Sequence, residues 1–248
     1  MITGKTCVVT GGSRGIGRGL VEKLLSRGNT VVATTRDAAA ASAAPLRDLA
    51  ARHPAALFVT ELDAASAGSV SAWADALTAR HGVKHIDLLI NNAGIYSADG
   101  RRPKFEEFTP DDFLAPFMTN AVGPFLVTQQ LAARKLLGPP GSLVVNVSSV
   151  MASNADATVS AVTPGAHAYR ASKAALNIMT TTLARDFERD GAQIQCCLVH
   201  PGYVRTDMTG GAGWVDVEES VGGILGVLEG GKPLNGRWYS FSGDEIPW

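Results

Sequence analysis

The sequence predicts an α/β fold in which one doubly wound parallel sheet of about seven strands carries helices on both faces. Short β-rich runs alternate with longer helical patterns along the chain, as in a sheet built from strand–helix–strand units. Runs such as 7–9 and 143–145 are apolar without interruption, which is typical of strands buried on both faces. No linker or shift in composition divides the 248 residues, so we expect residues 1–248 to form a single domain.

The expected elements alternate in a regular order. Strands are expected at 6–10, 30–35, 57–61, 86–91, 142–148, 193–199 and 238–241, and helices at 15–27, 45–53, 69–81, 111–137, 168–190 and 215–229. Two irregular segments, near 150–168 and 206–216, each follow a strand. Because open α/β sheets bind ligands outside the carboxyl ends of their strands, these segments are candidate substrate loops.

The composition excludes several classes of protein. With 46% hydrophobic and 18% charged residues the chain can bury a large core, unlike a disordered chain. A net charge of −1 gives no electrostatic surface for nucleic acid or an anionic membrane. No signal peptide or membrane-length apolar run is present, so we expect a cytoplasmic protein. The three cysteines lie in apolar runs and are expected to be buried thiols, and the histidines show no metal-ligand spacing.

A glycine-rich turn joins the first expected strand to the first helix. Backbone N–H groups and the dipole at a helix N-terminus attract a pyrophosphate, and glycines let the backbone approach it closely. The spacing G-x-x-x-G-x-G therefore predicts a dinucleotide site of the Rossmann type, although an ordinary strand–helix turn is the alternative. The residues of this site are Gly11, Ser13, Arg14, Gly15, Ile16 and Gly17.

The end of the second strand bears on the choice between NAD and NADP. An acidic side chain there would bind a ribose 2′-OH, whereas an arginine would accommodate a 2′-phosphate. Arg36 and Arg14 are placed to bind a phosphate from two sides, and Asp37 is the competing partner for a 2′-OH. We favour NADP(H) as the cofactor.

A tyrosine and a lysine four positions apart begin the long helix expected at 168–190. Positions i and i+4 share one face of a helix, so Tyr169 and Lys173 point the same way. A phenol with a pKa of about 10 is a weak acid–base catalyst at neutral pH, and a nearby ammonium lowers that pKa. Tyr169 is thus a candidate proton donor to a carbonyl oxygen. The alternative is an exposed helix face.

Three further polar residues are placed for a site at the same sheet edge. Ser149 follows the strand at 142–148, where its hydroxyl could hydrogen-bond a developing oxyanion or simply cap a turn. Asn91 ends the strand at 86–91. Asn120 lies within a helical pattern, where asparagine is unfavourable, and it is either functional or a solvent-exposed polar position.

Together these motifs resemble those of the short-chain dehydrogenase/reductase family over essentially the whole chain. The matching stretches are 10–17, Asp63, 91–94, Asn120, 148–149, 169–173 and 201–206, in the family's order. The resemblance implies a catalytic tetrad. In it Tyr169 is the acid/base, Ser149 orients the carbonyl, Lys173 holds the nicotinamide ribose and lowers the tyrosine pKa, and Asn120 anchors a water in the proton relay.

The resemblance also implies further cofactor contacts. Asp63 would contact the adenine, Asn91 would support the cofactor ribose, and Thr206 would hold the nicotinamide carboxamide. The remaining residues of the implied cofactor site are Ala93, Gly94, Pro201, Gly202 and Val204, together with Tyr169 and Lys173.

The C-terminal part, at 199–208 and 236–241, resembles the carbonyl reductase branch, which prefers NADPH. The ending at 243–248 also resembles bacterial C-factor and insect sniffer-like proteins. Ser149 and Tyr169 are 20 positions apart, several more than in most members. The extra residues near 154–164 are expected to roof the substrate pocket or to cover a helix face used for dimerisation. We therefore expect a monomer or homodimer rather than a tetramer.

Residues flanking the motifs are candidates for the substrate wall and suggest an apolar or aromatic carbonyl substrate; the alternative is that several of them pack against the core. They are Ile95, Tyr96, Met151, Tyr203 and Trp214. The basic cluster at 101–104 is expected to be a solvated loop, with attraction of an acidic substrate as the alternative.

The predicted function is NADPH-dependent reduction of a ketone or aldehyde, with the proton coming from Tyr169. One alternative is an NADP(H)-binding signalling or regulatory protein with little turnover. Another is a reductase of C=C or C=N bonds in a biosynthetic pathway. A family member that has lost its catalytic activity tends to lose its acid/base residue. All four tetrad residues are present here, which favours an enzyme.

Overall fold

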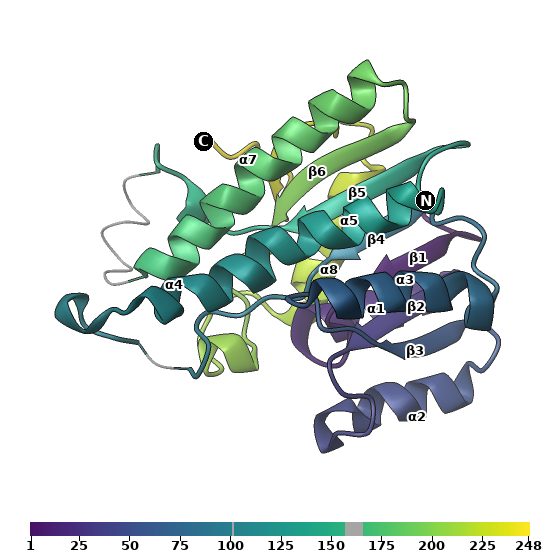
Figure 1. Ribbon diagram of the computed structural model, residues 1–248, viewed down its shortest axis with the longest axis horizontal. Helices are drawn as coiled ribbons and strands as arrows, with labels where there is room; N and C mark the ends of the chain where they lie inside the picture. Colours follow the sequence, from purple (N-terminus) through teal and green to yellow (C-terminus); the bar gives the residue numbers. More distant parts are fainter. Residues whose placement is uncertain (101, 157–165) are drawn as a thin grey trace.

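The computed structural model of the chain describes residues 1–100, 102–156 and 166–248, and its centre is a parallel sheet (Figure 1). Seven strands lie in the order β3-β2-β1-β4-β5-β6-β7, which confirms the expected fold class and number of strands. Their bounds lie within two residues of the expected ones. The strands are β1 (Thr6–Val9), β2 (Thr30–Thr35), β3 (Leu57–Glu61), β4 (Leu88–Asn91), β5 (Ser142–Val147), β6 (Ile194–His200) and β7 (Trp238–Ser240).

Helices cover both faces of the sheet because alternate strand residues point to opposite sides. Val8 and Val144 pack in one core with α3, α5 and α7, and Cys7 and Val145 pack in a second core with α1, α2 and α8. These helices are α1 (Gly15–Ser26), α2 (Ala44–Arg52), α3 (Ala67–His81), α5 (Gly123–Ala133), α7 (His167–Arg189) and α8 (Val217–Glu229). Figure 1 shows α5 and α7 side by side across one face.

The chain reverses its direction of winding between β1 and β4. It proceeds outward from β1 to β2 and β3, then returns to place β4 on the other side of β1. The carboxyl ends of β1 and β4 therefore flank the crevice in which a doubly wound sheet binds its ligand. The glycine-rich turn follows β1, and residues 92–94 follow β4.

The expectation of one continuous helix at 111–137 is wrong. The structure has α4 (Pro110–Phe117), a π-helical segment (Met118–Val122) and then α5. Proline explains the interruption, because Pro124 has no N–H to donate to the carbonyl of Asn120 four residues earlier. The π segment therefore lies at the functional asparagine predicted from the sequence.

In the described residues the remaining regular structure is short, with 3₁₀ turns at Ala41–Ala43, Phe105–Glu107, Val150–Ala152 and Asp207–Thr209. Cys7, Cys196 and Cys197 are buried free thiols in β1 and β6, as expected. None of the helices in the described ranges is long and apolar enough to cross a membrane. The extra residues expected near 154–164 lie mostly outside the described residues, which omit 157–165.

Candidate active site

The turns that follow β1 and β4 are tied together by hydrogen bonds. The hydroxyl oxygen of Thr10 accepts the N–H groups of Asn92 (3.0 Å) and Ala93 (3.1 Å). In return, the Asn92 amide donates to the carbonyl oxygens of Thr10 (2.9 Å) and Gly11 (3.1 Å). These bonds fix the position of the glycine-rich turn relative to the segment after β4, at the edge of the crevice. The sequence-based site omitted Thr10 and Asn92, although their position at two strand ends was a usable signal.

Glycine is required in this turn because the backbone segments nearly touch. A Cβ on Gly17 would lie 2.1 Å from the carbonyl oxygen of Gly11 and 2.4 Å from the Asn92 amide nitrogen. Gly11 has a φ of +67°, and a Cβ there would lie 2.9 Å from Cα of Ala93. The turn is therefore a cradle with no room for a side chain on its glycines, where backbone can approach a bound pyrophosphate closely.

The first turn of α1 is open toward this cradle. Arg14 is the N-cap residue, no side chain caps the helix, and its first turn carries no acidic residue. Its backbone N–H groups are thus left for an anion, and Ser13 and Ile16 flank them. The residues present fit a dinucleotide phosphate at this point.

The segment at 206–207, which is distant in sequence, lies against the same turn. A Cβ on Gly15 would lie 3.3 Å from the Thr206 methyl group, which places Thr206 directly beside the start of α1. The Arg14 guanidinium lies 3.4 Å from the Asp207 carboxylate, but both side chains are largely exposed and such a pair is weak. The structure thus brings Thr206, Arg14 and the cradle together, as a cofactor site requires.

The two candidates for the adenosine ribose differ in what they already bind. Arg36 is exposed immediately after β2. The Asp37 carboxylate accepts the backbone N–H groups of Ala39 (2.7 Å) and Ala40 (3.0 Å), so it closes its own turn. The exposed Asp63 follows β3, and its carboxylate accepts the N–H of Ala65 (3.0 Å).

Asn91 points its side chain into the protein rather than along the crevice. Its amide donates to the Asn146 side-chain oxygen (2.8 Å), and the Asn146 amide donates to the Thr180 hydroxyl (2.7 Å). This buried series of polar groups links β4 and β5 to α7. The Asn91 amide nitrogen is thus occupied within the protein, while its side-chain oxygen has no hydrogen-bond partner among the described residues.

The segment after β6 is fixed by close packing. A Cβ on Gly202, which has a φ of +89°, would lie 2.9 Å from the Phe241 ring. The Pro201 carbonyl accepts the Ser220 hydroxyl (2.7 Å), and Val204 pairs with Val215. These contacts fix the path of the chain between β6 and Thr206, which lies beside the cradle.

Lys173 and Asn120 meet beside Gly94 at the end of β4. A Cβ on Gly94 would lie 3.1 Å from the Asn120 side-chain oxygen and 3.6 Å from the Lys173 ammonium. The Asn120 amide group accepts from Ile95 N–H (2.9 Å) and donates to Ile95 O (2.8 Å) and to the Ser172 hydroxyl (3.0 Å). The Asn120 side chain therefore fastens the segment after β4 to α7.

Lys173 is buried, with its ammonium donating to the Val147 carbonyl (2.7 Å) and 5.9 Å from the Tyr169 ring centroid. Burial lowers the pKa of Lys173 to about 8. Burial also raises the pKa of Tyr169 to about 12, against a hydrogen bond with Ser149 that lowers it, and the neighbouring Tyr96 raises it further. The direction is opposite to the lowered tyrosine pKa expected from the sequence. The loss of water around the phenol outweighs the hydrogen bond from Ser149.

Ser149 begins a segment that is held on two sides. Its hydroxyl oxygen accepts the Met151 N–H (3.3 Å) in the turn that follows β5. Arg170 of α7 donates to the carbonyl oxygens of Met151 (2.7 Å) and Ser153 (3.2 Å). The chain near the C-terminus also contacts it, since the Pro247 carbonyl accepts the Ser153 hydroxyl (2.7 Å).

The structure separates the predicted substrate wall into distinct places. Tyr96 stacks on Tyr169, with ring centroids 5.1 Å apart and planes 27° apart. Tyr203 and Trp214 pack edge to face at 5.1 Å, beyond β6. Met151 instead borders a separate cavity of about 620 Å³.

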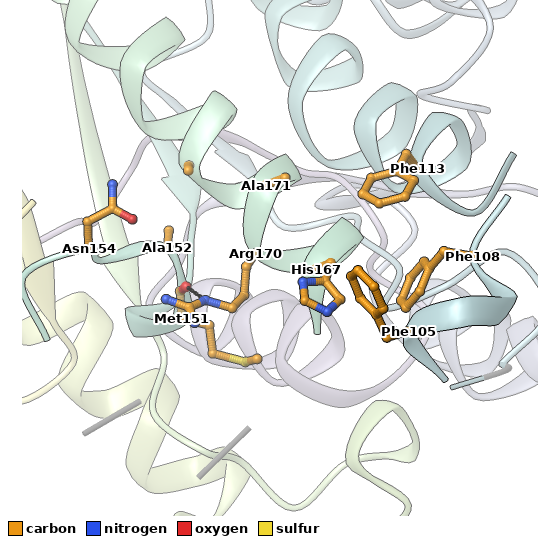
Figure 2. A pocket seen from close by; sticks show the side chains of 10 residues that line it. Phe105, Phe108, Phe113, Met151, Ala152, Asn154, His167, Arg170 and Ala171 are labelled. Carbon is orange, nitrogen blue, oxygen red and sulfur yellow. Dashed lines mark hydrogen bonds between the residues drawn. The ribbon is translucent and has the colours of Figure 1, made fainter. Parts of the chain in front are cut away.

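That cavity lies on the side of α7 that carries Arg170 and Ala171, and Tyr169 is not among its lining residues in the described parts of the chain. Figure 2 shows three aromatic rings of its wall gathered near His167 and Met151 beside Arg170. Within the described residues, Met151 and Tyr169 thus border different cavities.

Comparison with known proteins identifies the family of the chain. The family described as short chain dehydrogenase matches residues 5–213. The C-signal of Myxococcus xanthus is 36% identical over 164 residues, covering 66% of this chain and 93% of that protein. The NADPH-bound carbonyl reductase from chicken fatty liver superposes with a TM-score of 0.87 at 32% identity, covering 99% of this chain and 100% of that one. Carbonyl reductase Sniffer of D. melanogaster gives 0.82 at 26% identity, with coverage of 99% and 100%.

Proposed function

The chain belongs to the short-chain dehydrogenase family, and from that premise we propose that it is an NADPH-dependent reductase of ketones or aldehydes. The observation that carries the proposal is the meeting of Tyr169, Ser149 and Lys173 at the carboxyl edge of the sheet. Ser149 is near enough to the Tyr169 phenol to lower its pKa, and Lys173 lies beside Gly94 at the end of β4. A proton donor, a second hydroxyl and a cation thus converge next to the glycine cradle.

The crevice between β1 and β4 offers the groups that would hold the cofactor. The cradle of Gly11, Gly15 and Gly17 and the open first turn of α1 would bind the pyrophosphate. Asp63 would contact the adenine, and Thr206 and Lys173 would lie at the nicotinamide. When bound, NADPH supplies the hydride that reaches the carbonyl carbon.

The same crevice favours NADP(H) over NAD(H). Arg36 and Arg14 present guanidinium groups, which match the geometry of a phosphate. Asp37, the competing partner for a 2′-OH, already receives two backbone N–H groups. The solved relative from chicken fatty liver contains NADPH, which supports the same choice.

Tyr169 would give its proton to the carbonyl oxygen of the substrate. A pKa raised to about 12 keeps the phenol protonated at neutral pH, so it is ready to act as an acid. Ser149 would orient the same oxygen by hydrogen bonding as negative charge develops there. As the phenol O–H bond breaks and the alcohol O–H bond forms, the nearby Lys173 ammonium would stabilise the phenolate that remains.

The tyrosine must then regain a proton, and Asn120 is placed to assist. Its side chain is engaged by Ile95 and Ser172, so its backbone carbonyl is the group that would hold a relay water. Pro124 provides no α-helical N–H for that carbonyl. The Asn120 carbonyl would then serve as the acceptor for this water near the tetrad.

The experiment that tests the proposal measures NADPH consumption with ketones, aldehydes, quinones and enones. We expect turnover of a carbonyl substrate and a loss of about 10²- to 10⁴-fold in kcat for Tyr169→Phe, with the Kd for NADPH unchanged. Tyr239→Phe makes the same chemical change in β7, where the hydroxyl donates to Pro233, and should keep its activity. Binding of NADPH without turnover of any compound would favour the regulatory alternative, and exclusive turnover of enones would favour C=C reduction.

We also propose that the protein is a monomer or a homodimer. The longer connection between Ser149 and Tyr169 motivates this proposal. Light scattering at several protein concentrations measures the mass directly, and a tetramer would contradict the proposal.

A further inference from the structure

We propose that Arg102 recognises an anionic group on the substrate, so that the substrate class is a carbonyl compound that also carries a carboxylate or a similar anion. This inference rests on the proposed reductase function and adds the substrate class to it. It depends on the position of Arg102 relative to the predicted proton donor.

Three side chains place a cation next to the reaction centre. The Arg102 guanidinium carbon lies 5.1 Å from the centroid of the Tyr96 ring. The Tyr96 ring in turn stacks on the Tyr169 ring at 5.1 Å between centroids. All three side chains border one small cavity of about 20 Å³. The guanidinium is therefore separated from the proton donor by a single aromatic ring.

Arg102 has no carboxylate partner among residues 1–100, 102–156 and 166–248. Arg134, Arg189, Arg205 and Arg237 each form an ion pair with a carboxylate, whereas the contact of Arg102 is with the face of Tyr96. A guanidinium that rests on an aromatic face keeps its N–H edge available for a carboxylate or phosphate. The side chain is oriented by the ring, and its guanidinium makes no hydrogen bond to the described part of the chain.

One acidic residue, Asp112, borders the same cavity, and its carboxylate is already bound. One of its oxygens accepts both the N–H (2.8 Å) and the hydroxyl (2.8 Å) of Thr109 at the start of α4. Asp112 is buried and belongs to the helix cap, so it does not replace a substrate anion at Arg102.

The position of Arg102 separates its task from that of the cofactor arginines. Arg14 and Arg36 lie at the turns after β1 and β2, whereas Arg102 follows β4 on the side of Tyr96. The spacing suits a substrate whose anion and carbonyl are separated by about one aromatic ring. The carbonyl would lie toward Tyr169 and the anion at Arg102, with the body of the substrate spanning the length of the Tyr96 ring between them.

The test uses 4-carboxybenzaldehyde and its methyl ester, which differ at the anion and not at the aldehyde. Their Kd values are measured on the full chain with NADP⁺, which has no hydride to give, and turnover is measured separately with NADPH. We expect the carboxylate to bind about 10- to 100-fold more tightly than the ester, as a charge-assisted hydrogen bond allows. Arg102→Gln should remove this difference, and Arg102→Lys should keep part of it. Lys104→Gln, which removes a cation outside the cavity, should keep all of it.

The outcomes distinguish this inference from the proposed function. Equal binding of the two compounds, failure of both to bind, or a preference that persists in Arg102→Gln would overturn the inference. A preference that depends on Arg102 in a chain that reduces neither compound would support it, and that chain would then need another reaction for the same substrate class. Reduction of both compounds at equal kcat/KM would support the reductase and refute the anion site.

Discussion

The glycine cradle after β1 and the aromatic residues Tyr96, Tyr203 and Trp214 serve the same edge of the sheet but are built differently. In the cradle the fit is between backbone segments, with Gly17 so close to Gly11 that a methyl group would lie 2.1 Å from an oxygen. In the aromatic region the fit is between side chains, and Trp214 is 75% exposed.

This difference shows how one site can combine a cofactor side that tolerates few substitutions with a substrate side that tolerates many. Close backbone packing leaves the cofactor side almost no room for substitution, because no rotamer change relieves a clash with a carbonyl oxygen. Stacked and edge-to-face rings on the proposed substrate side can be exchanged with small changes in the rest of the fold. Substrate preference should therefore change far more easily than cofactor binding.

The largest effect is expected in the cradle. Gly17→Ala should lower the free energy of unfolding by about 3 kcal/mol or more and weaken NADPH binding by roughly 100-fold. Gly226→Ala in α8 is the matched control, because a Cβ there meets nothing within 4 Å, and it should stabilise the protein by up to about 1 kcal/mol. Urea unfolding and NADPH titration measure both quantities. A Gly17→Ala variant that binds NADPH normally would show that the cradle is not the phosphate site.

The next effect separates cofactor choice from cofactor binding. Arg36→Asp should lower the preference for NADPH over NADH in kcat/KM by about 10- to 100-fold, since it replaces a phosphate partner by a repelling charge. Arg52→Asp, the same change at the exposed end of α2, should leave the preference unchanged. Steady-state kinetics with both cofactors test this. Retention of the preference in Arg36→Asp would assign the 2′-phosphate to another group.

The pH dependence of the free energy of unfolding tests whether burial of the Lys173 ammonium in α7 destabilises the folded protein. Its folded-state pKa is about 8 against an ordinary 10.5, so the folded chain binds fewer protons than the unfolded chain between these values. Stability therefore rises with pH from about 8 to 10.5, and the full cost of the buried charge is present below pH 8.

We expect Lys173→Met to abolish turnover and to raise the free energy of unfolding at pH 7 by about 1–3 kcal/mol, because the lost bond to Val147 offsets part of the gain. The variant should also lose the rise of stability between pH 8 and 10.5. Urea unfolding at pH 7 and pH 10 measures both, with Lys104→Met as the exposed control. Lower stability of Lys173→Met at pH 7 would mean that the buried ammonium is a net stabilising group.

The smallest effect is expected at the aromatic side. Trp214→Ala should raise the KM for aromatic carbonyl compounds by about 2- to 10-fold, from the loss of one ring contact. The free energy of unfolding should change by less than about 0.5 kcal/mol, and NADPH affinity should not change. Met208→Ala removes another exposed apolar side chain nearby and is the control. Equal effects of the two substitutions would remove Trp214 from the substrate wall.

The same contrast explains what the sequence could predict. The cradle and the pairing of Tyr169 with Lys173 were found because glycine spacing and i,i+4 placement are local patterns. The direction of the Tyr169 pKa was not, because it depends on burial by groups such as Tyr96 that come from another strand end. The inward turn of Asn91 toward Asn146 also depends on packing between elements, which no spacing along the chain reports.

The π-helical segment at Met118–Val122 has a consequence for insertions and deletions. A residue beyond what a regular helix needs advances the face of everything after it by about 100°. The length of this segment, rather than the identity of its side chains, thus sets which face of α5 meets the sheet. A deletion of one of the other four residues there would keep every member of the tetrad in the sequence while placing Asn120 and α5 out of phase. Homologous chains should therefore tolerate length changes in the loops around the site but not within these five residues.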